Sequence, residues 1–122
     1  MERLRKRADF VAAASGIKIP AATFVLQARD RQDRGPIRIG FTVSKKVGNA
    51  VERNRVRRRL RELVRLKSDE ALRSGHDYVL VGRRAALSAE FERLAEEYDR
   101  AIARLGSPNA GAPKSRPKYK SR

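Results

Sequence analysis

The sequence predicts an α/β fold of the α+β type, a two-layer sandwich in which helices cover one face of a small mixed sheet. Three segments, residues 23–29, 37–44 and 77–84, have the apolar content and length of strands. Apolar residues at helical spacing mark three further segments, so the expected order is α-β-β-α-β-α. The length of 122 residues suggests a single folded domain, which we place at residues 1–105.

The chain is expected to begin with a short helix over residues 10–15. Asp9 is a candidate N-cap for this helix, and Gly16 is a candidate stop. The first strand follows. Residues 29–36 are polar and end in Gly-Pro, which predicts the turn of a hairpin between the first two strands.

The second strand and the central helix give the clearest patterns. Residues 37–44 alternate between apolar and polar side chains, as a half-buried strand does. Asn49 and Glu52 have the spacing of a capping box at the start of a helix. This helix has one apolar stripe, formed by Val56, Leu60, Leu63 and Val64.

The last part of the domain is predicted to contain the third strand and the last helix. The strands on either side of the central helix would be parallel if they share a sheet. Ser88 is expected to cap the last helix, and Gly106 is expected to end it. Residues 106–122 contain three prolines, five basic residues and no acid, which predicts a disordered tail. The tail either adds nonspecific attraction to RNA or has no function.

The net charge of +16, from 30 basic and 14 acidic residues, indicates a polyanionic partner, either nucleic acid or an anionic membrane surface. The chain has no cysteine, which excludes disulfides and thiolate metal sites. No apolar run reaches the roughly 20 residues that a membrane-spanning helix needs, and the N-terminus does not resemble a signal peptide. A cytoplasmic location is therefore expected.

The positive charge is concentrated in residues 50–65, where seven residues are arginine. Like charges four residues apart on a helix cost about 0.2–0.5 kcal/mol per pair, so this face is unfavourable without a partner. An external anion is the simplest compensation, and the planar guanidinium group binds phosphate oxygens in a bidentate way. Asn54 lies within this surface and either reads a base edge or ribose hydroxyl, or is an ordinary exposed residue.

Fixed positions within residues 41–62 carry a more specific signal. Val-Ser-x-Lys-x-Gly begins at Val43, Ala-Val-x-Arg-Asn-Arg begins at Ala50, and Arg-Glu follows at Arg61. This pattern resembles the signature of the bacterial ribonuclease P protein subunit. The resemblance implies a ribonucleoprotein endoribonuclease that removes the 5′ leader from precursor tRNA. It also implies that the RNA subunit carries the active site and the catalytic Mg²⁺, and that the strand-helix-strand crossover is left-handed.

The resemblance implies two sets of binding residues and no catalytic or metal-binding side chains in the protein. The RNA subunit, ribonuclease P RNA, would contact Lys45, Arg53, Asn54, Arg55, Arg57, Arg58, Arg61 and Arg65. The leader would contact Arg7, Phe10 and Lys46 in a cleft between the sheet and the first helix. Phe10 could instead anchor that helix to the core. Ala14 and Gln27 stand where relatives often have aromatic residues, which predicts weaker stacking of the leader here.

The residues themselves contain no nucleophile-base arrangement. His76, the single histidine, lies in a polar stretch and is expected to be structural or exposed. The acids near Asp30 and Asp69 are expected to be loop residues that do not bind Mg²⁺. No membrane and no obligate protein partner is expected. Two other classes remain open on the residues alone, a ribosomal or ribosome-assembly protein and a protein-only nuclease.

Overall fold

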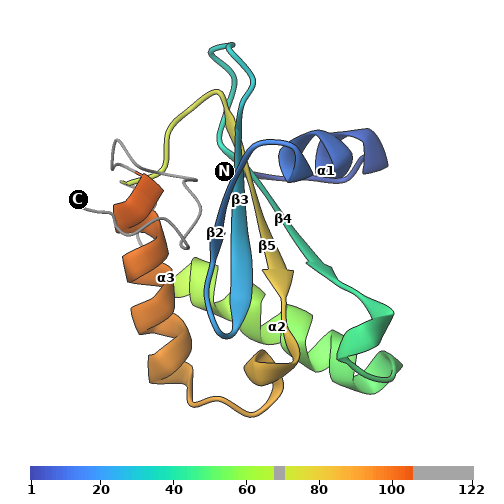
Figure 1. Ribbon diagram of the computed structural model, residues 1–122. Coiled ribbons are helices and arrows are strands. Elements are labelled where there is room, and N and C mark those ends of the chain that lie inside the picture. The colour runs from blue at the N-terminus through green and yellow to red at the C-terminus, as the bar shows by residue number, and fades with distance from the viewer. Residues whose placement is uncertain (68–70, 106–122) are drawn as a thin grey trace, which may run out of the picture.

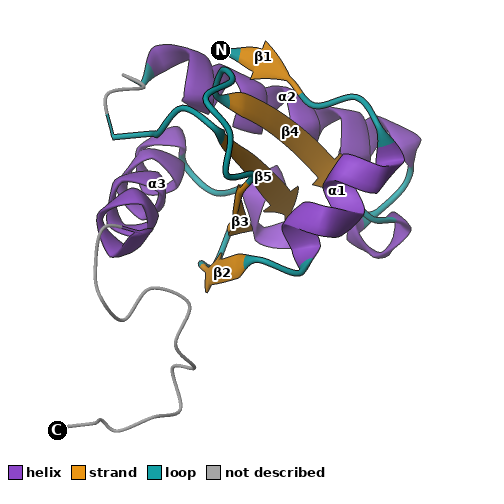
Figure 2. Cartoon of the chain, turned by 90° about the horizontal axis from the view of Figure 1, so that it is seen from above, coloured by secondary structure: helices purple, strands orange, loops and turns teal. Residues whose placement is uncertain are grey.

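One mixed sheet of five strands organises residues 1–67 and 71–105, the part of the chain that the computed structural model describes (Figures 1 and 2). The strand order is β1-β4-β5-β3-β2. The strands are β1 (Glu2–Arg3), β2 (Ile17–Pro20), β3 (Phe24–Asp30), β4 (Arg38–Val43) and β5 (His76–Gly82). The helices are α1 (Arg7–Ala14), α2 (Ala50–Leu66) and α3 (Phe91–Leu105), with short 3-10 helices η1 (Lys45–Val47) and η2 (Arg84–Leu87). The predicted α+β class is confirmed.

The central strand of the sheet is β5. It pairs in parallel with β4, as predicted for the strands that flank α2, and antiparallel with β3 on its other side. The predicted hairpin between β3 and β4 is therefore wrong. The segment between them crosses the start of β5, where Arg31 N donates to Gly75 O at 2.9 Å and Gly75 N donates to Gly35 O at 2.7 Å. A polar Gly-Pro turn shows that the chain reverses, but not which strand it pairs with next.

Two short strands were not predicted. β2 forms the actual hairpin with β3, in a register that runs from Ile17 opposite Ala28 to Pro20 opposite Val25. β1 adds a parallel edge strand beside β4. Segments of two and four residues are too short to show a period in the sequence.

The helices cover both faces of the sheet, whereas the sequence analysis placed them on one. α2 and α3 lie on one face, over a core that includes Leu26 and Leu80. α1 lies on the opposite face (Figure 2). On that face Val79 packs with Leu4 and Ala13. The crossover from β4 through α2 to β5 is left-handed (Figures 1 and 2), in agreement with the family resemblance and against the usual rule.

The starts of two helices differ from prediction. α1 begins at Arg7 with Lys6 as its N-cap, so Asp9 lies within the first turn, where an acid still suits the helix dipole. α3 begins at Phe91. Ser88 ends η2 and lies too far before Phe91 to cap α3. None of the described helices has the length and apolar character needed to cross a membrane. The predicted tail, residues 106–122, lies outside the described residues.

Candidate nucleic-acid interface

The basic face of α2 is held outward by the way the helix starts and by what it buries. Glu52 N donates to Asn49 Oδ1 at 2.9 Å, and Asn49 N donates to Glu52 Oε1 at 3.0 Å, which is the predicted capping box. Val56 and Leu60 are fully buried against the sheet. The opposite side of the same helix must therefore face away from the core.

Arg57, Arg58 and Arg61 form the outer ridge of α2. None of the three makes an ion pair with a carboxylate of the described residues. Arg57 Nη1 donates to Asn54 Oδ1 at 2.8 Å, so the amide oxygen of Asn54 orients a guanidinium group in the free protein. Within the described part of the chain the ridge thus has no carboxylate bound to it, which leaves its charge available to an external anion.

Arg59 and Arg55 turn toward the neighbouring segment η2. Arg59 donates to the carbonyl oxygens of Ala86 at 2.8 Å, Leu87 at 3.2 Å and Ala89 at 2.5 Å. Arg55 Nε donates to Leu87 O at 3.3 Å. Burial lowers the pKa of Arg59, and the nearby charge of Arg55 lowers it further. Arg59 therefore ties α2 to η2, whereas Arg55, which the resemblance placed at the RNA, has one long bond and is otherwise exposed.

Two residues of the predicted RNA-contacting set, Arg53 and Arg65, form hydrogen bonds with groups close to them in the sequence. Arg53 Nη1 donates to Gly48 O at 2.8 Å. Arg65 forms a bidentate pair with Glu62, at 2.9 Å from Nε and 2.6 Å from Nη2. Hydrogen bonding from Arg65 lowers the pKa of Glu62, and the same pair raises the pKa of Arg65. Lys45 is exposed at the start of η1.

The predicted leader residues lie around the other face of the sheet and the end of β4. Phe10 is half-buried against Gly40, where an added Cβ would lie 2.6 Å from Phe10 Cε1. Gln27 is the cross-strand partner of Val79, whose side chain packs beneath α1, so Gln27 shares that face. Arg7 at the start of α1 and Lys46 in η1 are exposed. Phe10 thus contacts the core, as the alternative interpretation expects.

Sequence reasoning missed a buried carboxylate on this face. Asp77 is fully buried in β5 and accepts from Arg31 Nη1 at 2.5 Å and from Arg38 Nε at 2.8 Å. Arg38 Nη2 also lies 3.4 Å from Asp9 Oδ1, which links the sheet to α1. Burial alone would raise the pKa of Asp77, but the hydrogen bonds from Arg38 and Arg31 outweigh burial, and the pKa is lowered. An acid at the start of an apolar strand was the available signal.

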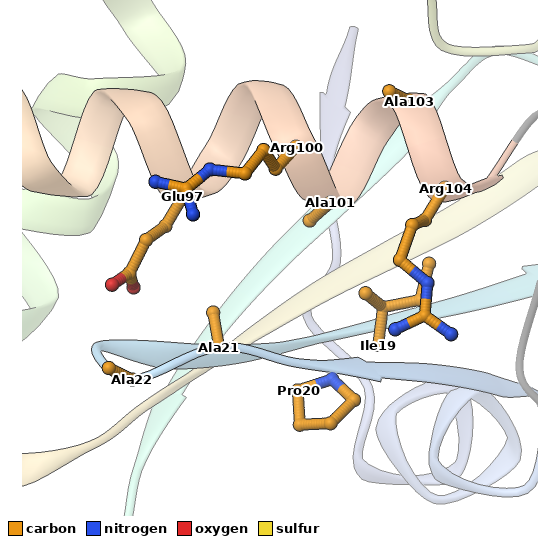
Figure 3. A pocket seen from close by; sticks show the side chains of 9 residues that line it. All are labelled: Ile19, Pro20, Ala21, Ala22, Glu97, Arg100, Ala101, Ala103 and Arg104. Atoms are coloured by element: carbon orange, nitrogen blue, oxygen red, sulfur yellow. The ribbon is translucent and has the colours of Figure 1, made fainter. Parts of the chain in front are cut away.

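The other sequence-predicted features are placed as follows. His76 Nδ1 lies 3.0 Å from Ser74 O and its ring stacks on Tyr78, with 6.1 Å between ring centroids. A cavity of about 460 Å³ lies between β2 and α3, beside Ile19, Glu97 and Arg104, and contains none of the predicted site residues (Figure 3). The described residues contain no group of three His, Cys, Asp or Glu side chains that could hold a metal ion.

Comparisons with known proteins agree with this architecture. The family profile described as Ribonuclease P matches residues 1–106. The ribonuclease P protein component of Gluconacetobacter diazotrophicus is 50% identical over 105 residues, which cover 85% of this chain and 90% of that relative. The component from Ruegeria pomeroyi is 49% identical over 109 residues, 86% of each chain.

Solved structures show the same fold. The RNase P protein of Thermotoga maritima has a TM-score of 0.69 and 28% identity, covering 85% of this chain and 97% of that chain. The RNase P protein of Staphylococcus aureus has a TM-score of 0.70 at 24% identity, covering 88% of this chain and 96% of that chain. The chain therefore belongs to the bacterial ribonuclease P protein family.

Proposed function

We propose that the protein binds the RNA subunit of ribonuclease P through the basic face of α2 and helps that RNA to remove the 5′ leader of precursor tRNA. The observation that carries the proposal is the ridge of Arg57, Arg58 and Arg61. Its three guanidinium groups have no carboxylate partner among the described residues, and the helix beneath them is fixed by a buried apolar stripe. Folded RNA supplies phosphates at the spacing and density that such a ridge can neutralise.

The remaining residues of the predicted set extend this contact along the helix. Lys45 lies in η1, just before α2, and Arg53 lies near the start of α2. Arg55 faces η2, and Arg65 lies in the last turn of α2. Asn54 can hydrogen-bond a ribose or base once Arg57 turns to a phosphate. The contacts to phosphate set the position of the protein on the RNA, while any base contact by Asn54 adds specificity.

The leader is assigned to the face of the sheet that α1 partly covers. Arg7 and Lys46 offer exposed positive charge for leader phosphates. Phe10 offers the edge of a half-buried ring, which supports only limited stacking because the ring also packs on Gly40. With Ala14 and Gln27 in place of aromatic residues, charge carries a larger share of leader binding than stacking does.

Hydrolysis and its magnesium ions are assigned to the RNA subunit. Magnesium prefers oxygen ligands, and in an RNA enzyme the phosphates provide them. The role of the protein is to neutralise phosphate repulsion and to position the substrate.

Reconstitution tests this function. The full-length protein is added to the RNA subunit and precursor tRNA at low Mg²⁺, where neutralisation by protein should matter most, and 5′ leader removal is measured. We expect a large gain in cleavage rate with wild-type protein. No gain would reject the proposal, and cleavage by rigorously RNA-free protein would favour a protein-only nuclease.

A triple variant of the ridge, with Arg57, Arg58 and Arg61 changed to alanine, separates RNA binding from folding. Each lost phosphate contact should reduce the slope of log K against log salt by about 0.9 or less. The free energy of unfolding, measured with urea, should be unchanged or slightly higher, because each repulsion that is removed is worth about 0.2–0.5 kcal/mol. Loss of folding in this variant would show instead that the ridge is structural.

A further inference from the structure

The N-terminal strand brings an additional arginine to the face of the sheet that α2 covers. Glu2 N donates to Ile37 O and Leu4 N donates to Ile39 O, both at 2.7 Å, so β1 is held along the edge of β4. Leu4 is 4% exposed and packs beneath α1 on the opposite face. Because successive side chains of a strand point to opposite faces, Arg3 points toward the side of α2.

A groove of about 340 Å³ lies where β1 meets the outer side of α2. Five side chains line it, those of Arg3, Arg58, Arg61, Glu62 and Arg65. The lining thus contains four guanidinium groups and one carboxylate, that of Glu62. Both oxygens of that carboxylate are taken by Arg65, at 2.9 and 2.6 Å.

The remaining three cations of the groove form no ion pair with another of the described residues. No ion pair joins Arg3, Arg58 or Arg61 to a carboxylate within residues 1–67 and 71–105. Arg3 and Arg58 are exposed and Arg61 is half-buried, so their side chains have room to reorient. Like charges gathered from two separate elements are unfavourable unless an anion lies between them.

We propose that this groove is a binding site for one phosphodiester group of the RNA subunit, in which Arg3 of β1 acts together with Arg58 and Arg61 of α2. The proposal rests on the proposed function and extends it, because it makes the N-terminal strand part of the RNA interface. A phosphate accepts several charge-assisted hydrogen bonds at once, and guanidinium groups supply them in a planar fork. The Glu62–Arg65 pair closes one side of the groove and leaves the other three cations for the ligand.

The first test compares Arg3→Gln with Arg5→Gln in the full-length protein. Arg5 is the matched control, because it is also exposed, lies two residues away and does not line the groove. Binding to the RNA subunit is measured at several salt concentrations. Arg3→Gln is expected to raise Kd by about tenfold and to reduce the salt slope by about one, while Arg5→Gln has a smaller effect on both. Equal effects of the two variants would overturn the site.

A double-mutant cycle shows whether Arg3 and Arg58 share one phosphate. If they do, Arg3→Gln should cost less affinity in an Arg58→Gln background than in the wild type. Strict additivity would mean two independent contacts and would contradict the proposal. Urea unfolding of each variant checks that the fold is retained, and the salt slope reports on phosphate contacts even if stability changes.

A second readout is independent of the RNA subunit. Inorganic phosphate is titrated into the full-length protein while NMR follows the guanidinium Nε–H signals of the groove. Saturable shifts of Arg3, Arg58 and Arg61 that disappear in Arg3→Gln support the site, and their absence overturns it. If the wild type fails to bind the RNA subunit, the proposed function is lost, and this titration alone still decides whether the groove binds phosphate.

Discussion

At the scale of single residues, Asp77 shows how charge can serve the fold and not the ligand. Its carboxylate is fully buried and is hydrogen-bonded by Arg31 and Arg38, while Arg29 lies 3.8 Å away. These arginines contribute to the net charge of the chain but are largely committed to a carboxylate. A basic residue that is bonded to a buried carboxylate, as Arg31 and Arg38 are, is therefore a weak candidate for RNA contact.

Stability should depend on the ionisation of Asp77. Because its pKa is lowered by folding, the stabilisation is present above the unfolded value, about 3.9, and is lost as pH falls below it. Asp77→Asn should cost about 3 kcal/mol at pH 7, since Arg31 and Arg38 both lose the buried carboxylate that accepts their hydrogen bonds. Urea unfolding at pH 7 and pH 3 measures this, and the gap between variant and wild type should narrow at pH 3.

The control for this prediction is Asp33→Asn. Asp33 also pairs with Arg31, and the hydrogen bond from Arg31 lowers its pKa, but its side chain is 51% exposed. An exposed ion pair of this kind contributes little to stability. A loss at Asp33 as large as that at Asp77 would contradict the assignment of the stabilisation to burial.

At the scale of elements, α2 is oriented from two sides. Its apolar stripe, with Val56 and Leu60 at its centre, packs on the sheet. Arg59 holds it to η2 and the residues that follow η2, through the carbonyl oxygens of Ala86, Leu87 and Ala89. Neighbouring arginines on one helix thus have opposite tasks, because Arg58 faces solvent while Arg59 faces protein.

Alanine at Arg59 and at Arg58 should separate these tasks. Arg59→Ala removes the donor to the carbonyl oxygens of Ala86 and Ala89 and should lower the free energy of unfolding by about 1–3 kcal/mol. The salt slope of RNA binding should be nearly unchanged. Arg58→Ala should reduce that slope by about 0.9 or less and leave unfolding nearly unchanged. Urea unfolding and RNA binding at several salt concentrations measure both. The assignment fails if Arg59→Ala reduces the slope as much as Arg58→Ala does.

At the scale of the whole molecule, the net charge of +16 should destabilise the folded state and favour the binding of RNA. Repulsion among unpaired cations opposes the compact state, while the same cations attract RNA. The ion pairs among the described residues lie mostly near the surface, where each contributes little to stability. Repulsion should therefore exceed ion pairing in the free protein.

This balance predicts opposite responses to salt. Between about 0.05 and 0.5 M KCl, screening should raise the thermal midpoint of the free protein, because the Debye length shortens over this range. Affinity for the RNA subunit should fall steeply over the same range. Thermal unfolding followed by circular dichroism, together with filter binding, measures both. A midpoint that falls with KCl would show that attractive ion pairs, and not repulsion, dominate the free fold.

The sequence by itself determined the features that depend on residues close together in the chain. The capping box at Asn49 and Glu52 and the apolar stripe of α2 follow from local geometry, and both are found as predicted. The apolar residues of β4 face the core as its alternation predicts, but Gly40 on the other face is buried too, because α1 covers that face. The outward face of α2 follows from the same stripe. The spacing of apolar residues along the sequence indicates which side chains of an element are buried.

Only the tertiary structure decided which segments meet. β5 lies between β3 and β4, α1 covers the other face of the sheet, and Arg3 reaches the groove beside α2. It also decided that Arg59 faces η2 while Arg58 faces outward. Strand pairing and the contacts of long side chains depend on residues distant in the chain, so no local period encodes them.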